Sequence, residues 1–380
     1  MMRWFPLLVF WGCVSFEDLE STDSPPISTD SAAGEGHGGV SDSAEIFDDS
    51  GSDDSGSDDS GSDDSGTDDS DTEPAGDYSR WGPWALGNSI TTITGSSLDA
   101  LYVYAWYPTA DSGGASRTYG WTGFEFTGGA QADAAPACEE TRPVMVHSHG
   151  NSSLAWEMYG VMEFMASHGW IVVAPDHAGN TLYANTEDFF TLVWRRPQDI
   201  RDSFDWLVEQ SEDPSSDLYG CIDPDAGYVA SGYSFGGYTA MVGAGALVND
   251  ATGPTYDFGD PRIWAVSTYA AWNAYEALTT GTAAIGVPAI TFGGLRDTTV
   301  FTQWRDLHDE ISSTPRAMAT FPDAGHFSFA PIYCWSRGDG CGSDYVDPEA
   351  VLSDTATSIL AFLEHLRGRS GALEQLAPES

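Results

Sequence analysis

The stretch YVASGYSFGGYTAMVGAGAL, residues 228–247, decides how we expect this chain to fold. Its first part is a short apolar run that predicts a buried strand, and its last part is typical of a helix. Between them stands a G-x-S-x-G pattern, residues 232–236, which could arise by chance in a chain with 42 glycines. The flanking elements distinguish a functional motif from a chance match. A strand, a sharp glycine turn and a helix together form a nucleophile elbow, which exposes a serine hydroxyl. We therefore predict that Ser234 is a nucleophile.

Strand and helix patterns alternate along the rest of the chain. Further strands are predicted at 98–108, 142–150, 170–177, 262–272, 287–294 and 315–326. Helices are predicted at 154–168, 197–211, 236–248, 299–312 and 348–367, the second of them beginning with Pro197 as its first helical residue. This alternation predicts an α/β fold with a parallel sheet covered on both faces, whose ligands bind at the carboxyl ends of the strands.

A serine hydroxyl needs a base to remove its proton, and the base needs an acid to orient it. The segment DAGHFSF places His326 just after the last predicted strand. The other downstream histidines, His308 and His365, lie inside predicted helices. His326 is therefore the predicted base.

The acid is predicted from the same topology. The segment GGLRDTT places Asp297 directly after the second strand that follows the elbow, at the sheet edge expected for Ser234. Asp323 is a poorer candidate because it stands only three residues before His326, and Glu276 lies well beyond the end of its strand. We expect Ser234, Asp297 and His326 to form the catalytic triad.

The oxyanion of the tetrahedral intermediate needs two backbone donors, one after the nucleophile and one in the loop after an earlier strand. The amides of Phe235 and Asn151 occupy these positions, and Gly150 allows the chain to turn so that the Asn151 amide can point inward. His147 and His149 could instead be an H-x-H metal pair. No third ligand has suitable spacing, so no metal is predicted.

Six segments in order resemble α/β-hydrolases of the dienelactone-hydrolase-like and platelet-activating-factor-acetylhydrolase-like group: MVHSHGNSS, MEFMASHGWIVVAPDHAGN, RRPQDIRDSFDWL, GYSFGGYTA, FGGLRDTT and DAGHFSF. The resemblance covers about residues 98 to 330. It implies the α/β-hydrolase fold, with a mostly parallel eight-stranded sheet flanked by helices, and hydrolysis of carboxylic esters without metal or organic cofactor. The acetylhydrolase branch carries its acid one strand earlier, so Asp297 matches the dienelactone-hydrolase or cutinase-like placement.

The amino-terminal segment MMRWFPLLVFWGC, residues 1–13, has one arginine and a short apolar run, and is typical of a secretion signal. Because it ends in Gly-Cys it resembles a lipoprotein signal, in which Cys13 would be lipidated and hold the protein at a bacterial cell surface. Phe10 and Trp11 are unusual there, so ordinary secretion and a buried amino-terminal strand remain alternatives.

Residues 14–77 carry 21 of the 58 acidic residues and none of the 14 basic ones, which are all arginine. Their Asp-Ser-Gly repeats offer nothing apolar to bury, so we expect a disordered acidic tether rather than a calcium-binding loop. Residues 78–370 are expected to form one catalytic domain, followed by a tail at 371–380. Of the whole chain's net charge of −44, residues 78–380 carry −24, from 37 acidic residues and 13 arginines. This charge argues against nucleic acid or anionic membranes as partners of the folded part, leaving the lipid anchor as the membrane contact.

The four cysteines after Cys13 suggest two disulfides in a secreted chain. Cys334 and Cys341 flank a short loop, and Cys138 and Cys221 each precede strands that are neighbours in this fold. The second pair would join the sheet at its far end, opposite Ser234. Neither pair is expected to be catalytic.

Together these features predict a secreted or surface-tethered serine esterase acting on esters with an apolar acyl or aromatic group. A serine peptidase of the same fold and an inactive fold used as a binding module are alternatives. Aromatic residues on segments that could line the pocket are Trp156, Tyr183, Trp272 and Trp304. The arginines of RRPQD are expected to form surface or helix-end ion pairs, and Asp176 is expected to anchor a loop.

Overall fold

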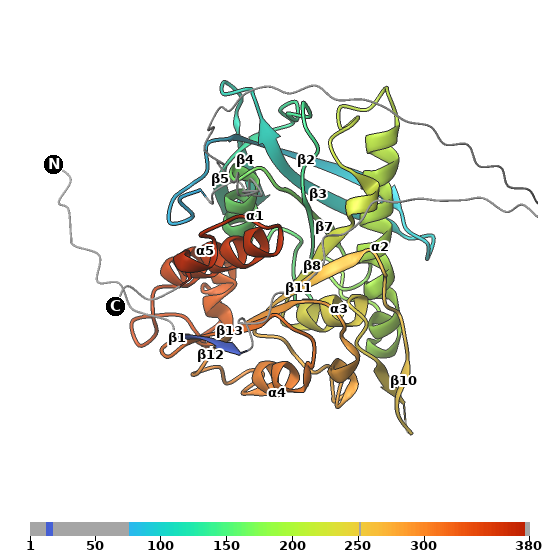
Figure 1. The fold of residues 1–380 in the computed structure, drawn as a ribbon, viewed down its shortest axis with the longest axis vertical. Coiled ribbons are helices and arrows are strands. Elements are labelled where there is room, and N and C mark those ends of the chain that lie inside the picture. Colours follow the sequence, from blue (N-terminus) through green and yellow to red (C-terminus); the bar gives the residue numbers. More distant parts are fainter. Residues whose placement is uncertain (1–12, 18–75, 251, 377–380) are drawn as a thin grey trace, which may run out of the picture. The chain divides into compact units, whose positions relative to one another are not determined.

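The computed structural model describes residues 76–250 and 252–376, together with the backbone of residues 13–17. Eleven strands form one sheet in the order β1-β13-β12-β11-β8-β6-β7-β3-β2-β5-β4 (Figure 1). Their bounds are β1 Cys13–Glu17, β2 Ala85–Thr94, β3 Ala100–Thr109, β4 Ser116–Trp121, β5 Phe124–Ala132, β6 Val144–Ser148, β7 Ile171–Asp176, β8 Tyr228–Tyr233, β11 Ile263–Tyr269, β12 Ala289–Gly294 and β13 Arg316–Phe321. The short strands β9 (Val248–Asp250) and β10 (Gly253–Tyr256) pair separately.

Six neighbouring strands run parallel to one another, in the order β13, β12, β11, β8, β6 and β7. Their carboxyl ends therefore share one edge of the sheet. Antiparallel pairing extends the sheet on both sides, through β3 next to β7 and through β1 next to β13. The prediction of a mostly parallel sheet is confirmed for its centre. The expected number of eight strands is too low, because β1 and the β4–β5 hairpin add three strands at the edges.

Within the described residues, five α-helices cover the two faces of the sheet: α1 Tyr159–Ser167, α2 Phe189–Glu212, α3 Phe235–Gly243, α4 Gln303–Glu310 and α5 Pro348–Leu366 (Figure 1). Alternate residues of each strand face opposite layers. Met145 of β6 packs in one core with α1 and α5, whereas Val144 and Val146 pack in the other with α2, α3 and α4. This period of two is the strand signal that the sequence carried.

Helix α2 begins eight residues before the start that the sequence predicts. Its N-cap is Asp188, whose carboxylate accepts a hydrogen bond from the Thr191 amide, and Pro197 lies inside the helix. The prediction that Pro197 opens the helix is wrong. Proline cannot bond to the carbonyl four residues back, but that carbonyl, of Val193, accepts a hydrogen bond from the Tyr238 hydroxyl at 3.2 Å.

The two ends of the described chain both contact the domain. The backbone of β1 pairs antiparallel with β13, with Cys13 opposite Thr320. The first residues of the expected tether, 14–17, therefore form part of a strand and are not disordered. Residues 371–376, expected as a tail, include a short 3₁₀ helix (Leu373–Gln375) and bury Ala372 and Leu376. The expected signal segment before Cys13 and the acidic repeats of residues 18–75 lie outside the described residues.

The four cysteines after Cys13 form the two pairs that the sequence suggested, Cys138 with Cys221 and Cys334 with Cys341. Cys138 and Cys221 stand before β6 and β8, which are neighbours, and their Cα atoms are 4.4 Å apart. This disulfide therefore joins the amino-terminal edge of the sheet. No helix in the described part of the chain is long and apolar enough to cross a membrane.

Candidate active site

Ser234 occupies the turn between β8 and α3, with φ of 54° and ψ of −114°. A residue other than glycine rarely adopts this backbone conformation, and such strain concentrates at functional turns. Two backbone hydrogen bonds hold the turn: the Ser234 amide donates to Tyr269 O at 2.9 Å, and the Trp272 amide donates to Ser234 O at 3.0 Å. The strand end of β11 thus fixes the conformation that the elbow requires.

Gly236 brings the loop after β6 against the elbow. A Cβ atom at this position would collide with the carbonyl of Ser148, so only glycine allows the two backbones to approach this closely. As a result, the predicted oxyanion residues Phe235 and Asn151 stand on two segments that touch. In the described part of the chain, no oxygen accepts a hydrogen bond from either amide. Both amides are therefore free to bind a ligand oxygen.

The side chains of Ser234, His326 and Asp297 lie in one line of hydrogen bonds. Ser234 Oγ is 3.0 Å from His326 Nε2, and His326 Nδ1 is 2.8 Å from Asp297 Oδ2. The other oxygen of Asp297 accepts hydrogen bonds from the amides of Thr299 and Val300, at 2.9 and 2.8 Å. These amides fix the carboxylate so that its free oxygen faces the imidazole.

The other candidates for the acid and the base do not take part in this line of hydrogen bonds. The Asp323 side chain is 61% exposed and pairs with Arg296, and Glu276 is exposed on the loop after β11. His308 is buried in α4 and hydrogen-bonded to Thr291 Oγ1 at 3.0 Å, and burial lowers its pKa to about 4. His365 belongs to the last turn of α5.

Tyr233, the residue before Ser234, has a positioning role that the sequence did not suggest. Its ring lies 5.0 Å from the ring of His326 and contacts Gly150, and its hydroxyl donates to His326 O at 3.2 Å. One buried side chain therefore contacts both His326 and the loop that carries Asn151.

The two histidines of the H-x-H pattern are buried and hydrogen-bonded within the fold, with His147 Nδ1 3.2 Å from Ser231 Oγ. His149 Nδ1 donates to Gly150 O at 2.7 Å, and its Nε2 accepts from the His177 amide at 3.0 Å, which fixes one neutral tautomer. Burial, assisted by the nearby Arg196 charge, lowers the pKa of His149 well below its usual range. In the part of the chain that the structure describes, no group of three or more histidine, cysteine or carboxylate side chains could hold a metal ion.

Arg196 is fully buried, contrary to the expectation that the arginines of RRPQD form surface or helix-end ion pairs. Its guanidinium donates to His149 O and to Asn180 Oδ1, and Asn180 Nδ2 donates to Asn151 Oδ1 at 3.0 Å. Burial lowers the pKa of Arg196 to about 9, which leaves it protonated at neutral pH. Arg195 alone makes the expected surface contacts, with Asp99 and Glu187. The RRPQD segment does not indicate which of its two arginines is buried, because this depends on how α2 packs against the sheet.

Asp176 anchors a loop, in line with its sequence interpretation. Its Oδ1 accepts a hydrogen bond from the Ala155 amide at 2.7 Å, so it joins the end of β7 to the segment before α1. Burial raises the pKa of Asp176 to about 7, and the neighbouring Glu157 acts in the same direction. Ala155 and the residues that follow it are held in turns, which explains why α1 begins at Tyr159 rather than at residue 154.

The four candidate pocket aromatics divide into two pairs. Trp156 and Trp304 are buried in the core, as most such aromatic residues are, and do not line a pocket beside Ser234. Tyr183 is exposed, and Trp272 is half-buried beside the Ser234 turn, with its ring 5.3 Å from that of Phe235.

Trp272 belongs to an aromatic cluster that also contains Phe189, Phe235 and Tyr275. Phe189 stacks on Phe235 at 5.7 Å and meets Tyr275 edge to face at 4.7 Å, and Trp272 lies 4.9 Å from Tyr275. Tyr275 is 75% exposed. The cluster therefore extends from the residue after Ser234 to the surface.

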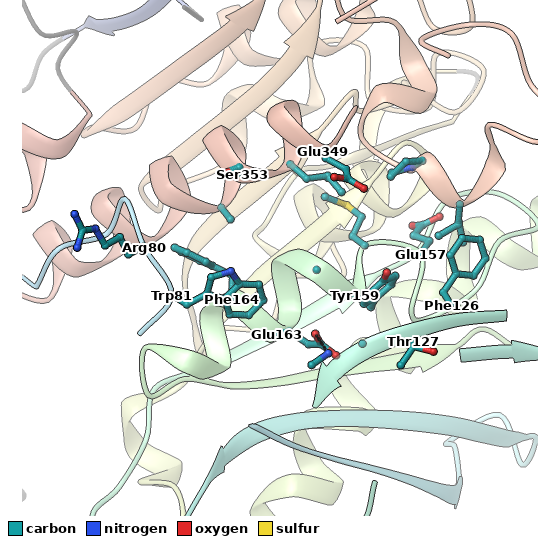
Figure 2. Close-up of a pocket in the computed structure, with 18 of the residues that line it drawn as sticks. Arg80, Trp81, Phe126, Thr127, Glu157, Tyr159, Glu163, Phe164, Glu349 and Ser353 are labelled. Atoms are coloured by element: carbon teal, nitrogen blue, oxygen red, sulfur yellow. Dashed lines mark hydrogen bonds between the residues drawn. The ribbon is translucent and has the colours of Figure 1, made fainter. Parts of the chain in front are cut away.

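A separate cavity of about 510 Å³ lies between β5, α1 and α5 and contains none of the three residues Ser234, Asp297 and His326 (Figure 2). Trp81 and Phe164 meet at one side of it, 5.8 Å apart, and Phe126 and Glu157 lie at the other. The carboxylate of Glu157 accepts a hydrogen bond from the Gly150 amide at 2.7 Å, so it supports the loop before Asn151.

The chain is similar in structure to a ferulic acid esterase from Streptomyces cinnamoneus, with a TM-score of 0.58 and 18% sequence identity over 81% of this chain and 95% of that one. No protein-family model and no curated protein matches the sequence. At this identity the likeness is one of fold, and it shows that the chain has the α/β-hydrolase fold.

Proposed function

We propose that this protein is a carboxylic ester hydrolase whose nucleophile is Ser234. The proposal depends chiefly on one observation, the line of hydrogen bonds from Ser234 Oγ through His326 to Asp297, at 3.0 and 2.8 Å. A hydroxyl on a strained elbow, an imidazole within reach of it and a buried carboxylate behind the imidazole are the parts that acyl transfer needs.

In the proposed reaction, His326 Nε2 takes the proton of Ser234 as its oxygen attacks the ester carbonyl. The amides of Phe235 and Asn151 donate hydrogen bonds to the oxyanion that forms, and each such donor contributes roughly 3 kcal/mol to lowering the barrier. The protonated imidazole then gives its proton to the departing alcohol. Water, deprotonated by His326, then attacks the acyl carbon. The imidazolium returns this proton to Ser234 Oγ as its bond to the acyl group breaks and the acid leaves. The proposal requires no metal or organic cofactor.

The substrate that fits this site has an apolar acyl or aromatic group. The cluster of Phe189, Trp272 and Tyr275 next to Phe235 offers stacking surfaces beside the reacting hydroxyl. Two further observations support an ester as the substrate. Six segments resemble dienelactone-hydrolase-like enzymes, and the similar solved structure is that of a ferulic acid esterase.

We further propose that the enzyme acts outside the cytoplasm. Two disulfides in the described domain support this, because such bonds persist in oxidising compartments. An anchor at Cys13 and an acidic tether after it are part of the same proposal. Incorporation of labelled fatty acid into the wild-type protein and its loss in Cys13→Ser would support lipidation, and equal labelling of both would contradict it.

The decisive experiment combines a fluorophosphonate probe with a panel of esters from acetyl to palmitoyl, including aromatic acyl groups. The wild-type protein should be labelled and should hydrolyse at least one ester. Ser234→Ala should lose labelling and lower kcat by roughly 10⁶-fold, because the triad acts as a unit. Ser97→Ala, a change at an exposed serine, is the control. An unlabelled wild-type protein would instead support the inactive binding module.

A further inference from the structure

The loop closed by the Cys334–Cys341 disulfide lies against the candidate site. The Cα atoms of this pair are 5.3 Å apart. Sequence reasoning assigned the two cysteines no role near the proposed triad. Within the loop, Asp339 directs its carboxylate toward the two segments that carry Asp297 and His326. The Asp339 main chain takes part as well, since its carbonyl accepts a hydrogen bond from the Phe327 amide at 2.9 Å.

Each oxygen of the Asp339 carboxylate binds a different segment. Oδ2 accepts hydrogen bonds from the Thr298 amide at 2.9 Å and from Thr299 Oγ1 at 2.7 Å. Oδ1 accepts from the backbone amide of His326 at 3.2 Å. One side chain thus joins the loop after β12 to the loop after β13.

The segment after Asp297 is the one that orients its carboxylate. The amide of Thr299 donates to Asp297 Oδ1 at 2.9 Å, while the hydroxyl of the same threonine donates to Asp339. Displacing Asp339 would therefore move a residue that holds the acid, and it would release the amide of the base at the same time.

The packing around this contact leaves little room for adjustment. A Cβ atom on Gly325, the residue before His326, would collide with Asp339 Oδ1 and with the backbone of Gly340. Ser328 Oγ donates to Gly340 O at 3.0 Å and accepts from the Gly325 amide at 3.1 Å. The disulfide-closed loop and the His326 loop are thus fitted to each other.

We infer that Asp339 is a positioning residue that fixes Asp297 relative to His326, and that the disulfide between Cys334 and Cys341 holds the loop of Asp339 in place. The inference rests on the proposed function, in which these two side chains work with Ser234. Asp339 does not touch the reacting atoms. Its effect is on geometry, and a misplacement of about 1 Å can lower a rate by about 100-fold.

Three variants test the inference. Asp339→Asn keeps the size of the side chain, but an amide has one oxygen and cannot accept hydrogen bonds on both sides. Thr299→Val keeps every charge and removes only the hydroxyl that binds Asp339. Asp323→Asn removes a carboxylate three residues before His326 and is the matched control, since its side chain is exposed.

With p-nitrophenyl butyrate, Asp339→Asn should lower kcat by about 10- to 100-fold with little change in KM. Thr299→Val should lower kcat in the same direction by about 3- to 10-fold, which separates positioning from loss of charge. Asp323→Asn should match the wild type within about twofold. Thermal unfolding midpoints of the four proteins show whether each variant is folded at the assay temperature.

Two measurements do not depend on ester turnover. The rate at which a fluorophosphonate modifies Ser234 should fall in Asp339→Asn and Thr299→Val. The downfield proton signal of His326 Nδ1, hydrogen-bonded to Asp297, should shift or broaden in both. If the wild type hydrolyses no ester, the proposed function fails, while these two readouts still decide the positioning role. Folded variants with wild-type labelling rates and an unchanged downfield signal would overturn the inference.

Discussion

The guanidinium carbon of Arg196 lies 4.5 Å from the centre of the Phe235 ring, whose backbone amide is a proposed oxyanion donor. The same guanidinium donates to Thr239 Oγ1 and Ser148 Oγ, each at 3.1 Å, in addition to its contacts with His149 and Asn180. A single buried cation therefore joins α2, α3 and the loop after β6 behind the proposed site.

Replacing Arg196 by methionine should leave several buried acceptors without a donor. We expect Arg196→Met to lower the free energy of unfolding by about 3 to 5 kcal/mol and to reduce kcat/KM, because the segment before Asn151 loses its support. Chemical denaturation and ester turnover measure the two effects. Arg195→Met, the same change at the neighbouring, partly exposed residue, should cost no more than about 1 kcal/mol, since its partners Asp99 and Glu187 are also partly exposed. Equal losses in the two variants would contradict the assigned role of Arg196.

Asp297→Asn should lower kcat by about 10⁴-fold with little change in KM. The asparagine oxygen can still accept from Thr299 and Val300, but its NH₂ group would face His326 Nδ1 and favour the wrong tautomer. Steady-state kinetics on the best ester of the panel measure the loss. If Asp323→Asn were the more damaging change, the acid of the triad would have been assigned to the wrong loop.

The stability of the protein should depend on pH through Asp176. Its pKa is about 7 in the folded protein and about 4 in the unfolded chain, so the folded state holds a proton that the unfolded state has lost between these values. This contribution to stability is complete below about pH 4 and is lost as the pH rises through 7, by up to about 1.4 kcal/mol per pH unit.

Asp176→Asn removes this titration and keeps an oxygen for the Ala155 amide. The free energy of unfolding of the variant minus that of the wild type should be larger at pH 8 than at pH 5. Urea denaturation of both proteins at the two pH values isolates the contribution of Asp176, since the other titrating groups are common to both. A stability difference that does not change with pH would contradict the assignment.

The aromatic cluster beside Phe235 should govern preference for the acyl group. Tyr275→Ser removes an exposed ring next to Trp272 and Phe189, and we expect KM to rise about tenfold for aromatic acyl esters but little for acetyl esters. Tyr219→Ser, at an exposed tyrosine beyond the carboxyl end of α2, should change neither. An equal rise in KM for both ester classes would show that the ring does not distinguish acyl groups.

The fold class could be predicted from the sequence because its signals are local. The strands at the centre of the sheet are short apolar runs, and the helices between them are amphipathic or flanked by capping residues. Strands β2, β4 and β5 were missed, since their residues are polar or glycine-rich and become strands only through their neighbours. For example, Asn88 of β2 is buried and donates its side-chain amide to Ala105 O of β3.

The sequence by itself determined the α/β class, the elbow at Ser234 and the strand ends from which Asp297 and His326 extend, because parallel strands bring their carboxyl ends to one edge whatever the distance along the chain. Only the tertiary structure decided what surrounds these residues. That Arg196 is buried while Arg195 is not, and that Asp339 joins two loops from inside a disulfide-closed segment, depends on contacts between segments far apart in the chain. No spacing or residue pattern encodes such contacts, because each is set by how helices and loops pack against the completed sheet.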